Sequence, residues 1–417
     1  MQSIFRSIVS IVLLCLVRFN YLSGQSVTLD SYLYIAAQSS PFLKEYDNAI
    51  AINRLDSLIL HRAFGPQVNV VSNDFYAPVV NGYGYDEIAT NIDQFDALIS
   101  VTKDLTGKRS LGNQSAAFGL KNESLTNERR KVSNEILKTV ADQYITAYAT
   151  LLEWRFNDSL LLLLQNEESV FKKLTEASVY QQTDYLSFLI TVQQQQFLVS
   201  KSKIAYSDAV SSLNYLCGIH DTSYISVSDP HLEWNTAPGF SKTVYRKQLQ
   251  IDSLLIMNAD RQIDLNYLPK VDVFADAGYL STFQFEGYKN FGASIGLNVS
   301  IPIYDGGQRS LAHNKTDIGL MQVHDQSNFL ERQYQQQYDQ IRQQYLANEK
   351  LRTQINAQLE YMHALIEANT KLIGSGNLAI ADLLLMLNNY KTIQYEFIRI
   401  DITKYQLINK LNHLSPQ

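Results

Sequence analysis

The chain has 417 residues, of which 46% are hydrophobic and 18% are charged, and an average soluble domain has about 25% charged residues. This composition excludes a highly charged disordered chain, while 8 Pro and 18 Gly exclude collagen-like sequence and long flexible linkers. The 26 Tyr and 18 Phe exceed what a plain coiled-coil rod requires, and a formal net charge of −6 disfavours nucleic acid as a partner.

Residues 1–24 are typical of a cleaved secretory signal. A positively charged start precedes an apolar stretch at 8–17, and Ser23 and Gly24 offer small residues at the cleavage site. The apolar stretch is shorter than the ~18 residues that a membrane anchor needs. Cleavage removes two arginines and no acid, which changes the net charge from −6 to −8. It also leaves Cys217 without a partner for a disulfide within the mature chain.

The first half of the mature chain is predicted to contain three helices and a β-hairpin. Residues 26–63 form the first helix, and a hairpin follows at about 67–103, where apolar and polar residues alternate in the second strand. The segment 110–175 has apolar residues at three- and four-residue steps and no Pro, which favours one long helix of ~100 Å. A shorter helix covers 182–217.

The second half is predicted to follow the same order. Apolar and small polar residues alternate over 291–301, and a hairpin is expected at about 270–302. A Pro-free helix covers 308–373. Strands of ~9–11 residues with one apolar and one polar face suit a β-barrel in a bilayer. An ordinary antiparallel sandwich has similar strands and stays an alternative, although so much helix weakens it.

The two halves also match in sequence at an offset of about 200 residues. We therefore expect two structural repeats, 25–218 and 240–417, joined by a connector at 219–239. The matched segments, in order, are 66–70 with 269–273, 100–111 with 300–311, and 183–186 with 381–384.

With these elements the chain resembles the outer membrane efflux protein family, the TolC-like exit ducts, over nearly all of its mature length. The most specific match is the strand-to-helix junction Ile301-Pro302-Ile303-Tyr304-Asp305-Gly306-Gly307. The resemblance implies a mostly α, α+β fold: a transmembrane β-barrel joined to a long antiparallel helical barrel in the periplasm. It also implies a homotrimer to which each protomer gives four strands and four helical columns.

The resemblance further implies a passive channel in the cell outer membrane. Such a duct serves a tripartite efflux or type I secretion system, and a periplasmic adaptor (membrane fusion protein) couples it to an inner-membrane transporter. Drug efflux, metal efflux and protein secretion share this architecture. One alternative is a periplasmic coiled-coil scaffold or adaptor without pore activity, and another is a secreted enzyme.

Glycines mark both predicted strand-to-helix junctions. Gly306 and Gly307 follow Asp305, and glycine adopts backbone angles that other residues avoid, so the strand can swing into the helix. Gly107 stands at the matching place in the first half.

The resemblance assigns two periplasmic tip turns, where a Gly six residues before an Asp reverses the chain. Gly376 precedes Asp382 in this way, whereas the first tip has Ser178 before Asp184, which leaves its turn geometry open. The two acids are expected either to form rings that favour cations or to cap the following helices. Leu385 stands where some relatives carry a second acid. The tip and gate candidates are Ser178, Thr183, Asp184, Gly376, Asp382 and Leu385.

Two further groups of side chains are candidates for contacts. Leucines after the second tip are expected either to meet an adaptor or to pack against sister helices; they are Leu383, Leu384 and Leu387. Aromatic residues near the hairpin turns are expected to form a membrane-interface belt or to cover the barrel mouth; they are Tyr76, Tyr83, Tyr85, Tyr279, Phe283, Phe285 and Tyr288.

Enzyme chemistry has little support in the sequence. The seven histidines show no paired ligand spacing, and we find no nucleophile motif and no metal cluster. We therefore predict no catalytic residue, no metal site and no cofactor.

Overall fold

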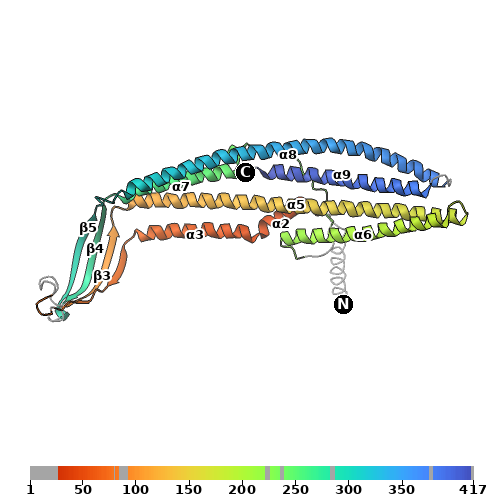
Figure 1. The fold of residues 1–417 in the computed structure, drawn as a ribbon. Helices are drawn as coiled ribbons and strands as arrows, with labels where there is room; N and C mark the ends of the chain where they lie inside the picture. The colour runs from red at the N-terminus through yellow and green to blue at the C-terminus, as the bar shows by residue number, and fades with distance from the viewer. Residues whose placement is uncertain are drawn as a thin grey trace, which may run out of the picture. The chain divides into compact units, whose positions relative to one another are not determined.

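The computed structural model describes residues 27–78, 80–83, 93–220, 226–234, 239–281, 287–374 and 379–414, which form mostly helix and one sheet (Figure 1). The predicted signal segment at 1–24 lies outside these residues. The elements in chain order are α2 (Leu29–Ser39), α3 (Pro41–Ala63), β1 (Gln67–Val71), β2 (Phe75–Tyr76), β3 (Asp93–Asp104), α5 (Lys108–Glu176), α6 (Gln182–Leu216), η2 (Phe240–Lys242), α7 (Val244–Asn266), β4 (Lys270–Ser281), η3 (Gly287–Lys289), β5 (Phe291–Ser300), α8 (Gln308–Gly374) and α9 (Ile380–Leu414).

The long helices end close to where the sequence predicts. α5 has 69 residues and α8 has 67, and neither contains Pro. The helical span predicted at 26–63 consists of two separate helices, α2 and α3, and the first of them ends just before Ser40-Pro41. Ser40 adopts an extended conformation (ψ 119°), as a residue before proline prefers, and Pro41 then opens α3. No helix within the described ranges has the length and apolar character needed to cross a bilayer.

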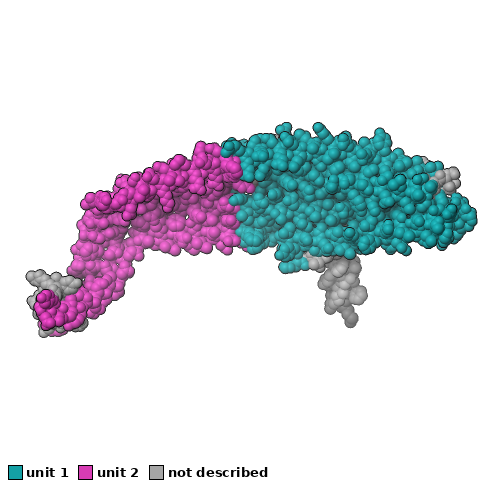
Figure 2. Space-filling model, viewed as in Figure 1, with its two compact units in different colours: residues 1–43, 130–243, 331–417 teal, residues 44–129, 244–330 magenta. Residues whose placement is uncertain are grey.

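The chain divides into two compact units, coloured separately in Figure 2. Unit 1 contains Met1–Leu43, Arg130–Thr243 and Glu331–Gln417, and unit 2 contains Lys44–Arg129 and Val244–Leu330. Each unit therefore takes segments from both halves of the sequence. The predicted halves, 25–218 and 240–417, differ from these compact units.

Unit 1 has an apolar core made by its helices. One cluster joins α5, α6 and α9 through side chains such as Phe171, Phe188 and Met386. A second joins α2, α5 and α6 through Tyr32, Tyr144 and Leu213, among others, and includes Cys217. These side chains repeat at helical spacing, so each helix contributes one apolar face to the core.

Tyrosine hydroxyl groups bind the connector between the two halves to the helices of unit 1. Asp229 accepts hydrogen bonds from Tyr148 Oη of α5 (3.1 Å to Oδ2) and from Tyr405 Oη of α9 (2.9 Å to Oδ1). Tyr206 Oη accepts a hydrogen bond from the Val227 N–H at 3.1 Å. Because Tyr148 lies in the first half and Tyr405 in the second, the connector links helices of both.

Amide side chains hold the helices of unit 2 together. Asn113 of α5 and Asn258 of α7 each donate from Nδ2 to the other's backbone carbonyl at 3.0 Å. Asn127 donates to the Val244 carbonyl at 2.8 Å, and Asn53 of α3 donates to the Phe118 carbonyl at 2.9 Å. Each bond requires one particular alignment of two helices, so these asparagines, of which Asn53, Asn113 and Asn127 are buried, fix the register between neighbours.

The sheet belongs wholly to unit 2 and is antiparallel. Its strand order is β1-β3-β4-β5, with the short β2 also paired to β3. Ten residues of β3 pair with β4, and ten residues of β4 pair with β5. The pairing of β3 with β4 thus joins the hairpin of the first half to the hairpin of the second.

Candidate functional site

One face of the sheet is apolar across four strands. Residues directly opposite each other on paired strands share a face, and the register sets Val70 against Ile99, Ile99 against Ala277, and Ala277 against Ala293. Lys103 and Ser281 lie on this face at its two ends. The apolar residues of the face are Val68, Val70, Phe95, Ala97, Ile99, Val101, Val271, Val273, Ala275, Ala277, Tyr279, Phe291, Ala293, Ile295, Leu297 and Val299.

The opposite face is mainly polar or small. It includes Gln67, Asn69, Ser100, Thr102, Asp272, Asp276, Ser294, Asn298 and Ser300, together with the larger apolar residues Val71, Leu98, Phe274 and Leu280. Phe274 lies across Gly296, where an added Cβ would come within 2.4 Å of the ring. Ser294 Oγ lies 3.4 Å from Asp276 Oδ2. Acids and amides on this face suit contact with water.

The apolar face has no cover in the part of the chain that the structure describes. Ile295 is 79% exposed and Leu297 is 65% exposed, and no helix is drawn across either face of the sheet (Figure 1). A soluble sandwich would bury this face under a second sheet, but the described strands belong to a single sheet. A large exposed apolar surface of this kind marks a site of contact with a membrane or with another apolar partner.

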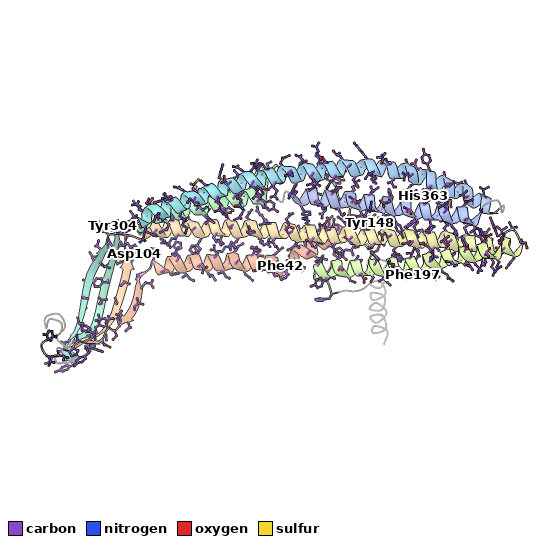
Figure 3. The ribbon with its side chains drawn as sticks, viewed as in Figure 1. Phe42, Asp104, Tyr148, Phe197, Tyr304 and His363 are labelled. Carbon is purple, nitrogen blue, oxygen red and sulfur yellow. The ribbon has the colours of Figure 1, made fainter. Side chains whose placement is uncertain are left out.

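Aromatic side chains gather at the end of the sheet where β3 and β5 begin and β4 ends. The long helices α5 and α8 follow the opposite end of these strands. Tyr279 and Phe291 pair edge to face across β4 and β5, with ring centroids 5.3 Å apart. Tyr76, Tyr83 and Tyr288 are all exposed near the strand ends. The other predicted members of this group, Tyr85, Phe283 and Phe285, lie outside the described residues. At the other end, Tyr304 follows β5 where α8 begins and is exposed (Figure 3).

Asp305 organises the junction between β5 and α8. It accepts hydrogen bonds from the backbone N–H groups of Gly307 (2.9 Å) and Arg309 (2.7 Å) and from Tyr267 Oη (2.5 Å). These bonds, that from Tyr267 first, hold the pKa of Asp305 below its ordinary value. Gly306 (φ 67°) and Gly307 (φ 84°) take left-handed angles, so the backbone freedom predicted for these glycines is used.

The junction between β3 and α5 is built differently. Asp104, labelled in Figure 3, accepts from the N–H groups of Thr106 (2.7 Å) and Gly107 (2.8 Å). Gly107 was expected to supply unusual backbone angles, but the structure gives it another role. A Cβ at Gly107 would lie 2.3 Å from the Phe64 ring and 2.4 Å from the Asp104 carboxylate. Close packing therefore explains this glycine.

The first tip turns without a glycine. Ser178 adopts a left-handed angle (φ 61°), and the Val179 N–H donates to the Leu174 carbonyl at 2.9 Å. The Ser178 N–H donates to the Thr175 carbonyl at 3.0 Å, which completes the Schellman arrangement that usually has glycine at this position. The turn geometry left open by the sequence is thus that of a glycine turn with serine in its place.

Asp184 lies in the first turn of α6, as the capping interpretation expects. Its carboxylate accepts from the Gln181 N–H at 3.3 Å, and an acid here is also favoured by the helix dipole. Thr183, next to it, is exposed. Phe171 and Phe188, with ring centroids 4.7 Å apart, join α5 to α6 behind the turn.

The second tip is described in part, because Gly376 lies outside the described residues. Asp382 is exposed in the first turn of α9, and its N–H donates to the Ala379 carbonyl at 3.1 Å. Leu383 and Leu387 are buried in the α5–α6–α9 core cluster, and Leu384 packs partly buried against it. Leu383 and Leu387 therefore do not offer the free surface that a contact with an adaptor needs. Leu385 is 61% exposed.

Sequence reasoning missed two features of the junctions. Aligning the halves at an offset of 200 sets Tyr304 against Asp104, so the shared role of Asp104 and Asp305 was hidden by a shift of one residue. An Asp shortly before a Gly at a strand end is the signal that finds both. The contacts of His313 with α7 were also missed, because the acids that it meets lie some fifty residues earlier in the chain.

Comparison with solved structures identifies the fold. No protein-family model matches the sequence, and no curated protein matches it. The chain is similar to CusC, whose structures concern transmembrane channel formation, at a TM-score of 0.74 with 11% identity over 94% of this chain and 93% of that one. It is similar to the outer membrane protein VceC from Vibrio cholerae (TM-score 0.72, 12% identity, 93% and 95% covered).

A third similar structure is the open state of the MtrE outer membrane channel of Neisseria gonorrhoeae (TM-score 0.72, 10% identity, 95% and 94% covered). Nearly the whole length of each protein is matched, so the likeness extends to the order of strands and helices. The fold of the chain is that of the TolC-like outer membrane channels, as the sequence resemblance predicted.

Proposed function

We propose that this chain is the protomer of an outer-membrane exit duct, in which the sheet of unit 2 forms part of a β-barrel in the membrane and the helices extend into the periplasm. The observation that carries the proposal is the uncovered apolar face of the sheet. Its strands β4 and β5 have 12 and 10 residues, which suits a tilted strand across a bilayer. The likeness to solved outer membrane channels supports the same conclusion.

The open edges of the sheet support association of the chain into a homotrimer. In the described residues β1 and β5 are the outer long strands, and each pairs on one side. Free edges invite pairing with another chain, and β5 of one copy against β1 of the next closes a ring when the rotation is cyclic. Unit 2 also carries exposed apolar residues on α3 (Ile52, Leu55, Ile59) and on α8 (Leu311, Ile318), which give neighbouring copies a helical contact.

The duct itself is passive. It works together with an inner-membrane transporter, which supplies energy, and a periplasmic adaptor, which reaches the helical tips. For the adaptor contact we retain Leu384, which is only partly buried, while Leu383 and Leu387 support the protomer core instead. The polar face of the sheet lines the channel in this proposal.

Acids at the tips give the duct a preference for cations. Asp184 and Asp382 each occur once per protomer, and threefold symmetry repeats each into a ring. Capping by Asp184 does not conflict with this role, because a carboxylate that accepts a backbone N–H keeps its negative charge.

The test is single-channel conductance of the purified full-length protein in a planar lipid bilayer. We expect discrete steps of current with cation preference, and a weaker preference in Asp184→Ala and Asp382→Ala. Ser187→Ala, a neutral change on the exposed surface of α6 near the first tip, is the matched control and should leave the preference unchanged. Absence of conductance, with full recovery of the protein in the osmotic-shock fraction, would instead support the periplasmic scaffold.

A further inference from the structure

A network of charged side chains joins α7 to the first turns of α8. Asp260 and Asp264 lie one turn apart on α7, and Arg309 and His313 lie one turn apart on α8, so two acids face two bases. His313 Nδ1 lies 2.7 Å from Asp260 Oδ1, and His313 Nε2 lies 3.0 Å from Asp264 Oδ1. Arg309 Nη2 lies 2.7 Å from Asp264 Oδ1. All four residues belong to unit 2.

The geometry of His313 requires a particular protonation state. Both ring nitrogens are within hydrogen-bond distance of a carboxylate oxygen, and an ionised carboxylate is only an acceptor. A neutral imidazole has a single N–H, so it can donate to one of the two acids and must turn a lone pair towards the other. Only the imidazolium ion donates to both. In agreement, the hydrogen bonds to Asp260 and then Asp264 raise the pKa of His313 in spite of its partial desolvation.

The same network reaches the strand-to-helix junction. The guanidinium of Arg309, which pairs with Asp264, lies 5.3 Å from the centre of the Tyr267 ring. Tyr267 Oη in turn donates to Asp305, which also accepts the Arg309 N–H. Asp264 is therefore shared between His313 and the residues that set the path of the chain from β5 into α8.

We propose that His313 forms a pH-sensitive contact between α7 and α8 at the β5–α8 junction. In its charged form His313 holds the two helices together, and it releases this contact when it loses its proton. The charged groups that face it are Asp260 and Asp264 from α7 and, from its own helix, Arg309 across Asp264; the hydroxyl of Thr316 also bonds Asp260 at 2.6 Å. A pH-dependent contact between α7 and α8 is a property that goes beyond the proposed channel function.

The direction of the pH dependence follows from the raised pKa. The contribution of His313 to the stability of the contact is complete below the ordinary histidine pKa of about 6.5 and is lost as the pH rises through the higher pKa of the folded state. A pH below the ordinary histidine pKa therefore keeps α7 and α8 in contact at this junction, and a pH above the folded pKa of His313 loosens the contact.

The first half of the chain offers an internal control. There α3 meets the start of α5 through His61 Nε2, which lies 3.3 Å from Ser115 Oγ. A hydroxyl group both donates and accepts, so this contact suits a neutral imidazole as well as a charged one. The β3–α5 junction should therefore show no corresponding dependence on histidine charge.

The experiment is hydrogen exchange of the purified full-length protein from about pH 6 to about pH 9, expressed as protection relative to unstructured peptide at the same pH. Four chains are compared: the native sequence, His313→Gln, which is neutral throughout, His313→Arg, which is charged throughout, and His61→Gln. The peptide that covers 303–316 reports on the junction.

We expect protection of this peptide in the native chain to fall with rising pH, by about tenfold for each pH unit that separates the folded pKa of His313 from its ordinary value. The native chain should match His313→Arg at low pH and His313→Gln at high pH, and His61→Gln should follow the native chain. A protection that varies equally with pH in all four chains would overturn the proposal.

A second measurement uses the native chain alone and does not depend on the folding of any variant. NMR titration of the imidazole signals in the native chain should find His313 as a histidine with a raised pKa. Titration at or below the ordinary value would overturn the proposal. Neither hydrogen exchange nor the NMR titration depends on conductance. Failure of the His313 proposal is therefore distinguishable from failure of the proposed channel function.

Discussion

Ser178 and Gly306 solve the same steric problem with different residues. Both adopt left-handed backbone angles, but a side chain in this region costs about 1–2 kcal/mol that glycine avoids. At Ser178 the Schellman hydrogen bonds and the packing of Phe171 against Phe188 behind the turn offset this steric cost. The first tip is therefore a site where the native residue is not the most stable one.

Ser178→Gly should stabilise the protein by about 1 kcal/mol, since the steric cost that it removes exceeds the opposing gain in chain entropy of the unfolded state. Ser178→Ala keeps a Cβ and is the matched control, with little expected change. The free energy of unfolding in urea measures both. A Gly variant no more stable than the Ala variant would show that the turn carries no strain.

Asp229 supplies a pH-dependent contribution in unit 1. Burial alone would raise its pKa, but hydrogen bonds from the His231 N–H, Tyr405 and Tyr148 outweigh burial and hold the pKa below its ordinary value. Burial first, and then the charge and hydrogen bond of Asp229, raise the pKa of Tyr148 to about 12. The stabilisation that the ionised Asp229 provides is therefore present above its unfolded pKa of about 3.9, and it is lost as the pH falls through the folded pKa of Asp229.

Tyr405→Phe should lower the free energy of unfolding by about 1–2 kcal/mol at neutral pH, because it removes a hydrogen bond to a carboxylate. At a pH well below the folded pKa of Asp229 the difference should nearly vanish. Tyr361→Phe, at an exposed position of α8, is the control. Equal losses for Tyr405→Phe at neutral and acid pH would contradict the assigned role of the Asp229 charge.

At the scale of elements, the sequence predicted the helices and β5 well, because their signals are local. A Pro-free apolar period defines α5 and α8, and strict alternation defines β5. The element lengths support the predicted duplication: α3 and α7 have 23 residues each, and α6 and α9 have 35 each. The duplication itself stays a prediction.

The features that sequence reasoning missed depend on partners far away in the chain. Val70 and Val71 break the alternation of β1, and only pairing with β3 decides that Val70 shares the apolar face while Val71 does not. Likewise Leu383 and Leu385 look alike in sequence, yet the core cluster of α5, α6 and α9 buries the first and leaves the second exposed. Burial of one position in an apolar run is set by the neighbouring helices.

Two neighbouring positions of β5 give a matched test of the sheet. Leu297→Lys places a charge on the apolar face and should cost about 2–4 kcal/mol if that face meets the bilayer centre, whereas Asn298→Lys places the same charge on the polar face at little cost. The amount of heat-resistant folded protein in the outer-membrane fraction measures the difference. Similar yields for the two variants would argue against a lipid-facing surface.

At the scale of the molecule, the sheet and the helices of one protomer are incomplete for different reasons. The sheet has an uncovered apolar face and two open edges among its described strands, while the helices of unit 2 carry exposed apolar residues on α3 and α8. In the proposed assembly, lipid covers the first kind of surface and sister copies cover the second. The stability of the protein should therefore depend on its assembly as well as on its own core.

The central claim is that alternate residues of β5 face lipid and water, and nitroxide accessibility tests it most directly. Single cysteines at 294, 295, 297, 298 and 299 of the full-length protein in lipid vesicles would each carry one label. Cys217 should not compete, because it is buried and burial raises the pKa of its thiol to about 11. The account predicts that labels at 295, 297 and 299 collide with oxygen dissolved in the lipid, and that labels at 294 and 298 collide with a water-soluble nickel complex. Equal access of the nickel complex to both sets would contradict it.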